Sequence, residues 1–349
     1  MKHIRENLKR GVSALAKPEG RRVGSPGHAH ARAWLLEKVR LAGLAPYRGD
    51  GFELSYTEGG ERFTNIVGVI RGRHPTLEPI LIGAHYDSVI DAPCADDNAA
   101  AVVIALEVAE ALLGGNLERD VVIAFFDAEE PPYFQSPMMG SIRFYEDQMD
   151  ERGLHAALVM DLVGHDVVLP VGQALRSLRV MPSMIKGLGL KLPRLRNLLF
   201  ITGAESHPEM VDLLQGASID DLPIVATLNE YIGDLSDHGV FRSNGIPYLF
   251  LSCGRWKHYH EPTDTPERLN YMKMARITNL VVYLTERLNA SPFGRGEKAG
   301  DFTVSLEIEL LERAFGPLYP LLLRGAGVAR LEERADVDQV ASAFLSVGL

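Results

Sequence analysis

The sequence predicts a three-layer α/β/α protein, in which helices cover both faces of a mixed, mostly parallel central sheet. Residues 121–126, VVIAFF, form a continuous apolar run rich in β-branched and aromatic side chains, which is typical of a strand buried on both faces. A strong helical segment precedes this run and another strand-like run precedes the helix. Such a strand–helix–strand unit joins two parallel strands through a right-handed crossover.

Each predicted element follows from its own pattern. Residues 28–43 show helical periodicity and end at Gly43, a residue type that often follows the last turn of a helix. Residues 98–115 predict a second, strongly apolar helix that ends in a Gly-Gly pair. The predicted strands are 63–72, 78–87, 121–126, 155–164 and 246–254.

The chain of 349 residues is long enough for one large domain, or for one domain with an appendage. Pro and Gly residues between 292 and 300 mark a boundary. We therefore expect a main domain over 1–294 and a helical C-terminal extension over 295–349. The apolar segment 310–325 predicts a helix that packs on the domain or on another subunit, which leaves a homo-oligomer open.

Composition excludes several classes of protein. The formal net charge is -10, so we expect neither nucleic acid nor an anionic membrane as a partner. The longest apolar run, 99–106, is far too short to span a bilayer. The N-terminus is charged without an apolar core, and the two cysteines give no disulfide framework. These features predict a cytoplasmic protein.

Three acids, Asp127, Glu129 and Glu130, follow the buried run 121–126 within four positions. Like charges held close together oppose folding unless something compensates them. Other residues able to bind metal fall at or just past the ends of the other predicted strands, and the carboxyl ends of parallel strands meet at one edge of a sheet. These residues are His85, Asp87, Asp96, Asp97, Asp161 and His260.

Charge and chain geometry favour a metal site there. Two imidazoles and three carboxylates carry about -3, and two zinc ions carry about +4, so one hydroxide brings the sum near zero. His85 and Asp87 are two apart on a strand and share a face. Asp87 can therefore accept the imidazole N–H that does not face a metal. Because Glu129 and Glu130 are adjacent, one can bind metal while the other acts as a general base.

The motifs GAHYDS, ADDNAA, DAEE, MDLVG, SDHGVF and YHEPTDT stand in the order found in the M28 family of di-zinc metallopeptidases. The chain resembles this family, which includes bacterial aminopeptidases, over much of its length. The resemblance implies that Glu129 is the general base or acid and that Asp87 supports His85. It makes Asp96 the ligand that bridges both metals, followed by a cis peptide bond. The implied metal ligands are His85, Asp96, Glu130, Asp161 and His260.

The resemblance also implies the zinc-exopeptidase fold and a hydrolase, a metalloprotease that cleaves peptides with two Zn²⁺ ions, for which Mn²⁺ or Co²⁺ could substitute. Aminopeptidase action is preferred over carboxypeptidase or dipeptidase action. A glutaminyl-cyclase-like acyltransferase with one zinc is an alternative, and a non-catalytic binding module is a weaker one. The segment 131–141 is longer and richer in proline than in the family, so the side-chain preference does not carry over.

Overall fold

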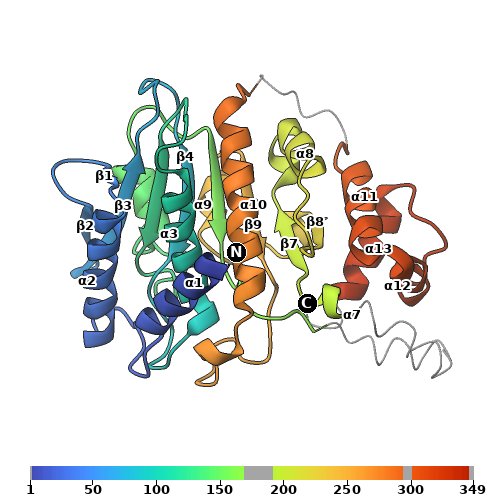
Figure 1. Cartoon of the computed structure of the whole chain (residues 1–349), viewed down its shortest axis with the longest axis horizontal. Coiled ribbons are helices and arrows are strands. Elements are labelled where there is room, and N and C mark those ends of the chain that lie inside the picture. Colours follow the sequence, from blue (N-terminus) through green and yellow to red (C-terminus); the bar gives the residue numbers. More distant parts are fainter. Residues whose placement is uncertain (1, 169–191, 294–300, 346–349) are drawn as a thin grey trace.

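The computed structural model describes residues 2–168, 192–293 and 301–345, which form one mixed sheet between layers of helices (Figure 1). The strands follow the order β1-β3-β5-β4-β6-β9-β7-β8, and β2 also pairs with β3. Their bounds are Ala45–Pro46 (β1), Glu53–Glu58 (β2), Glu61–Ile70 (β3), Ile80–His85 (β4), Val121–Phe126 (β5), Ala156–Met160 (β6), Leu199–Thr202 (β7), Ile224–Thr227 (β8) and Tyr248–Ser252 (β9).

The centre of the sheet is parallel. Strand β4 pairs in parallel with both β5 and β6, and β6 pairs in parallel with β9. Antiparallel pairing joins β3 to β5 on one side and β7 to β9 on the other. The carboxyl ends of β4, β5, β6 and β9 therefore lie along the same edge, as the sequence predicts.

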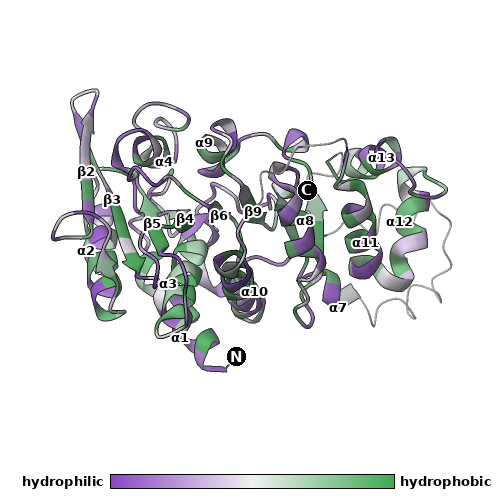
Figure 2. Cartoon of the chain, turned by 90° about the horizontal axis from the view of Figure 1, so that it is seen from above, coloured by the Kyte–Doolittle hydropathy of each residue, from purple (hydrophilic) through white to green (hydrophobic). Residues whose placement is uncertain are grey.

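Side chains of the central strands alternate between two apolar cores. Val121, Ile123 and Phe125 of β5 belong to the larger core, whereas Val122 and the other alternate residues belong to the opposite one. Figure 2 shows helices on both sides of the sheet. On one side lie α1 (Lys2–Leu15), α3 (Ala100–Leu112) and α10 (Tyr271–Ala290), and on the other α4 (Gly140–Arg143) and α9 (His238–Ser243). The predicted three-layer architecture is confirmed.

The long predicted elements are present with small shifts at their ends. The first predicted helix is α2 (Pro26–Leu41), which begins after the N-cap Ser25. Gly43 follows it with a φ of 77°, in the left-handed region that glycine adopts without a steric penalty. The sequence prediction missed β1, β2, β7 and β8. Three of these strands have four residues or fewer, too short to show a clear alternation.

The described part of the C-terminal region is helical. It contains α11 (Val304–Phe315), α12 (Tyr319–Ala326) and α13 (Arg334–Leu345), which lie beyond β8 at one end of the sheet (Figure 1). The predicted helix over 310–325 is interrupted, because a 3₁₀ turn at Gly316–Leu318 separates α11 from α12. Leu306, Leu310 and Leu311 join the larger core, so α11 packs on the domain. The predicted boundary at residue 294 lies outside the described residues.

None of the helices in the described ranges is both long and apolar enough to cross a membrane.

Candidate metal centre

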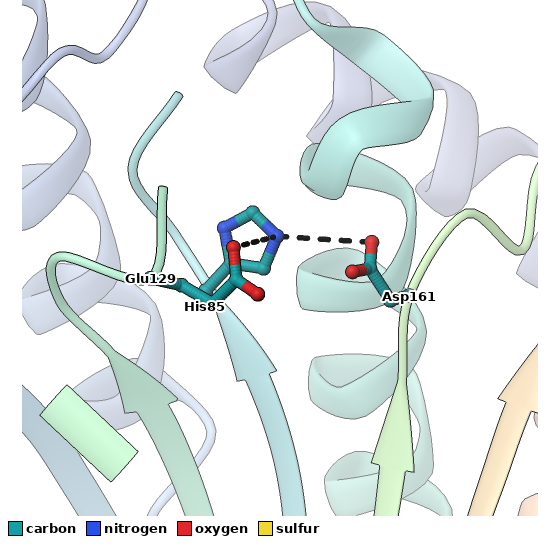
Figure 3. A group of neighbouring side chains, drawn as sticks. All are labelled: His85, Glu129 and Asp161. Carbon is teal, nitrogen blue, oxygen red and sulfur yellow. Dashed lines mark ion pairs between the residues drawn. The ribbon is translucent and has the colours of Figure 1, made fainter. Parts of the chain in front are cut away.

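The ends of four strands bring acidic and imidazole side chains to one edge of the sheet. His85 is the last residue of β4, Glu129 and Glu130 follow β5, and Asp161 follows β6. Figure 3 shows the His85, Glu129 and Asp161 side chains pointing toward one another from three neighbouring strands. His260 arrives from the loop that follows β9. The predicted convergence at the carboxyl ends of parallel strands is present in the structure.

Two groups of candidate metal ligands lie side by side. The first holds His85, Glu129 and Asp161, and the second holds Asp97, Glu130 and His260, with the ligand atoms of each group within 4.8 Å of one another. In the first group, His85 Nε2 lies 3.7 Å from both Glu129 Oε2 and Asp161 Oδ1. In the second, His260 Nε2 lies 3.2 Å from both Asp97 Oδ2 and Glu130 Oε2.

The Asp97 carboxylate joins the two groups. Its Oδ1 lies 3.3 Å from His85 Nε2, while its Oδ2 faces His260 Nε2. A carboxylate in this position can offer one oxygen to each of two cations. The side chain is almost completely buried, so its charge needs compensation from these neighbours or from a bound cation.

The resemblance assigned the bridging position to Asp96, but in the structure the Asp97 carboxylate is the one that lies between the two imidazoles. Asp96 Oδ1 accepts a hydrogen bond of 2.5 Å from the Gly164 N–H, and its Oδ2 lies 2.6 Å from His165 Nδ1. Neighbouring side chains leave the backbone in different directions, so only one carboxylate of the pair can face the imidazoles. The cis peptide bond also lies one residue later than predicted, between Asp97 and Asn98.

The buried polar atoms of the site fit a pair of divalent cations. Unpartnered buried atoms are rare in proteins, and each calls for an explanation such as a bound ion. Within the described residues, Glu129 contributes no such atom. Those of the site are His85 Nε2, Asp97 Oδ2, Glu130 Oε1, Asp161 Oδ1 and His260 Nε2. Imidazole nitrogens and carboxylate oxygens are the ligands that zinc accepts, so these five residues fit two zinc ions.

The electrostatics of the site also fit bound cations. Burial raises the pKa of Glu129 well above its ordinary value, and burial together with Asp97 raises the pKa of Glu130 to about 8. Burial alone would lower the pKa of His260, but Asp97 and Glu130 outweigh it and raise the pKa to about 10. Glu129 and Glu130 are therefore easier to protonate than ordinary carboxyl groups, and a bound cation would offset the cost of their negative charges.

Asp87 holds residues of the centre in place through hydrogen bonds. Its Oδ1 lies 3.2 Å from His85 Nδ1, within the hydrogen-bond reach that the sequence predicts. A carboxylate partner on Nδ1 directs the other ring nitrogen, Nε2, into the site, which is the arrangement found where an imidazole binds a metal. The same carboxylate accepts 3.1 Å hydrogen bonds from the backbone N–H groups of Glu129 and Glu130. Asp87 thus fixes the imidazole and the following acidic turn together.

Two further residues hold the turn that carries Asp97, and the sequence analysis assigned a role to neither. The Asp264 carboxylate accepts hydrogen bonds from the backbone N–H groups of Asp96 and Asp97 at 3.0 to 3.2 Å. Arg21 is only 1% exposed, and its guanidinium donates to the carbonyls of Cys94 and Asp97. Asp264 lies within the YHEPTDT motif, whereas no local pattern around Arg21 indicates its role.

A further buried carboxylate, Asp237, lies near the centre. Both of its oxygens are buried without a partner, and burial raises its pKa to about 7, partly opposed by the nearby charge of His85. The next residue, His238, turns the other way, with Nε2 3.0 Å from Asn229 Oδ1. Of the SDH motif, Asp237 therefore lies near the centre, whereas His238 contacts Asn229.

The thiol of Cys94, which precedes this turn, is buried, and burial raises its pKa to about 12. The residue is therefore a neutral packing group.

The fold resembles solved structures of exopeptidases and of glutaminyl cyclases. The Legionella pneumophila LapA aminopeptidase matches with a TM-score of 0.62 at 17% identity, over 83% of this chain and 73% of that chain. A Zn-dependent exopeptidase from Parabacteroides distasonis matches with a TM-score of 0.60 at 15% identity, over 82% of this chain and 98% of that chain. The Porphyromonas gingivalis glutaminyl cyclase matches with a TM-score of 0.59 at 18% identity, over 81% of this chain and 98% of that chain. These likenesses define the class of fold, that of the zinc-dependent exopeptidases.

The sequence narrows the class to one family. The sequence model of Peptidase family M28 matches residues 65–175 and 194–285, and the chain belongs to this family. It is 30% identical over 221 residues to uncharacterized protein YfbL of Escherichia coli K12, covering 59% of this chain and 65% of YfbL. It is 23% identical over 285 residues to leucine aminopeptidase 1 of Neurospora crassa, covering 76% of this chain and 63% of that protein. The chain therefore spans less than two thirds of either relative.

Proposed function

We propose that the protein is a metal-dependent peptidase with two zinc ions, acting as an aminopeptidase on peptides. One ion would lie between His85, Asp161 and Asp97, and the other between Asp97, Glu130 and His260. The observation that carries the proposal is the pair of buried ligand groups joined by one carboxylate. Mn²⁺ or Co²⁺ could replace zinc, because the same nitrogen and oxygen ligands accept them.

Glu129 would provide the general base. When bound, the two ions would act as Lewis acids that polarise the scissile carbonyl and acidify a water molecule. The Glu129 carboxylate is buried, has a raised pKa and lies 3.7 Å from His85 Nε2. It would take the proton of the attacking water and pass it to the leaving amine. Asp87 would keep Glu129 and His85 aligned through its hydrogen bonds to both.

Aminopeptidase action is favoured by the relatives named leucine aminopeptidase. Carboxypeptidase and dipeptidase action remain alternatives, because the segment 131–141 departs from the family pattern. A one-zinc glutaminyl-cyclase-like acyltransferase shares the fold, but the two ligand groups favour a pair of ions over one. The retained ligand groups also disfavour a non-catalytic binding module.

The test combines metal analysis with a substrate screen. Protein purified without chelator should contain about two zinc ions per chain, and should release product from aminoacyl anilides or dipeptides. A chelator should abolish turnover, and added zinc should restore it. The matched control is Glu129→Gln, which should keep the metal and lose the activity. Failure to bind zinc in a titration would overturn the proposal, and one ion with cyclisation of N-terminal glutamine would favour the cyclase.

We further propose a cytoplasmic location, which the two buried, unpaired cysteines fit because cytosolic thiols stay reduced. Cell fractionation tests the location. Self-association through the C-terminal helices is a second proposal, which sedimentation of the purified chain tests.

A further inference from the structure

The C-terminal helices lie outside the region that matches the family, yet they contact the segment that leads to the metal centre. At the heart of this contact is Arg334, at the start of α13. Its guanidinium donates to both carboxylate oxygens of Glu307 and of Asp301, at 2.7 to 2.9 Å. Glu307 is only 1% exposed. The ion-pair cluster therefore fixes α13 firmly to the start of α11.

The same cluster reaches the main domain through one phenol. Arg334 Nη1 donates to the Tyr231 hydroxyl at 3.2 Å, and this hydroxyl in turn donates to Asp338 of α13. Tyr231 ends the short 3₁₀ turn Asn229–Tyr231, called η4. Both hydrogen bonds of the Tyr231 hydroxyl thus come from the C-terminal extension.

From η4, hydrogen bonds run toward the metal centre. Asn229 Oδ1 lies 3.0 Å from His238 Nε2. The Nδ2 group of Asn229 donates a 3.0 Å hydrogen bond to Asp234 Oδ1. His238 directly follows Asp237, the buried carboxylate beside the centre. The Asp234 carbonyl accepts a 2.8 Å hydrogen bond from Gln135, in the loop that follows Glu129 and Glu130. Residues 229–238, which we call the bracing segment, therefore carry Asp237 and are hydrogen-bonded to the loop that follows Glu130.

We propose that the C-terminal helices position the bracing segment for catalysis, with Tyr231 as the positioning residue that transmits the contact. This inference rests on the proposed function, because it concerns how the same site is held. Tyr231 and Asp338 would act through Asn229, His238 and Asp237, without touching the substrate. The alternative is that the helices only add stability, since α11 also packs into the main core.

The test uses two mild variants, because removing Arg334 would leave a buried Glu307 charge unpaired and could unfold the extension. Tyr231→Phe and Asp338→Asn each weaken the phenol contact and keep the ion pairs of Arg334 with Glu307 and Asp301. Asp338→Asn also removes the 3.9 Å ion pair between Arg334 and Asp338, so Tyr231→Phe is the more specific of the two variants. Gln339→Ala is the matched control, since this exposed neighbour on α13 bonds only to the Ala326 carbonyl inside the extension. For each protein, kcat, KM, bound zinc, Tm and hydrogen exchange of amides 229–238 are measured.

We expect Tyr231→Phe and Asp338→Asn to lower kcat/KM about 3- to 10-fold, the size of the net effect of one ordinary hydrogen bond. Bound zinc should be unchanged, amides 229–238 should exchange faster, and Gln339→Ala should match the wild type. A lower Tm with unchanged kcat, KM and exchange would overturn the inference and leave only a stabilising role. If the wild type hydrolyses no peptide, the proposed function fails by itself. Hydrogen exchange then decides the inference: faster exchange supports bracing, and unchanged exchange refutes it.

Discussion

The variant Asp97→Asn tests whether Asp97 or Asp96 is the carboxylate that bridges the two metal positions. In the structure, the Asp97 oxygens face the imidazoles of His85 and His260 at 3.3 and 3.2 Å. Asp97→Asn preserves the shape, but removes one negative charge and replaces one oxygen with an N–H donor. Both proposed metal positions lose a ligand charge at once.

The size of the effect follows from the charge removed. Two unit charges 4 Å apart attract by about 4 kcal/mol at the effective dielectric constant typical near a protein surface, and every 1.4 kcal/mol is tenfold in affinity. Loss of the Asp97 charge should therefore weaken zinc binding on the order of 10³-fold at each position. Asp96→Asn disturbs only the contacts to Gly164 and His165. Loss of such an outer contact costs about 10- to 100-fold.

The assay is a zinc titration of the metal-free protein against a competing chelator, with circular dichroism to show that both variants are folded. We expect Asp97→Asn to lose both ions under conditions in which Asp96→Asn keeps them. The opposite order, with zinc lost from Asp96→Asn and retained by Asp97→Asn, would refute the assignment of Asp97 and restore that of Asp96.

Three further predictions test other parts of the site and fold. Glu129→Gln should lower kcat by about 10²- to 10⁴-fold with zinc retained, whereas Glu130→Ala should lose zinc; elemental analysis with kinetics checks both, and reversed results would exchange the two roles. Asp87→Asn should weaken zinc binding or activity about 10- to 100-fold, because the amide offers one neutral oxygen in place of the two charged oxygens that face His85, Glu129 and Glu130; unchanged values would remove Asp87 from the site. Burial lowers the pKa of His155 from 6.5 to about 4, so the unfolded chain binds more protons between these values. This contribution to stability is complete above pH 6.5 and is lost as the pH falls toward 4. Between pH 6.5 and 4, the Tm of His155→Gln should therefore fall less than the Tm of the wild type. Parallel curves of Tm against pH would contradict the lowered pKa of His155.

Much of the fold could be predicted because long elements carry their signal locally. The apolar run 121–126 predicted a strand buried on both faces, and every residue of β5 is buried. The carboxyl ends of parallel strands share an edge wherever such strands occur. The convergence of His85, Asp161 and the Glu129–Glu130 pair therefore followed from their positions after predicted strands.

The short strands and the break within 310–325 were not predictable in the same way. Strands β7 and β8 have four residues each, and pairing with neighbours stabilises them more than any pattern of their own. Gly316 and Pro317 interrupt the C-terminal apolar segment and divide it into α11 and α12.

The sequence by itself determined the family, the layers of the fold and the kinds of residue that meet at the edge of the sheet. It did so because apolar periodicity and the order of motifs are local properties of the chain. Only the tertiary structure decided that Asp97, and not Asp96, faces both imidazoles. That choice depends on Asp264 and Arg21, which lie far away in sequence and hold the backbone of the turn. Two adjacent aspartates are chemically alike, and only the direction in which the folded backbone points each carboxylate distinguishes them.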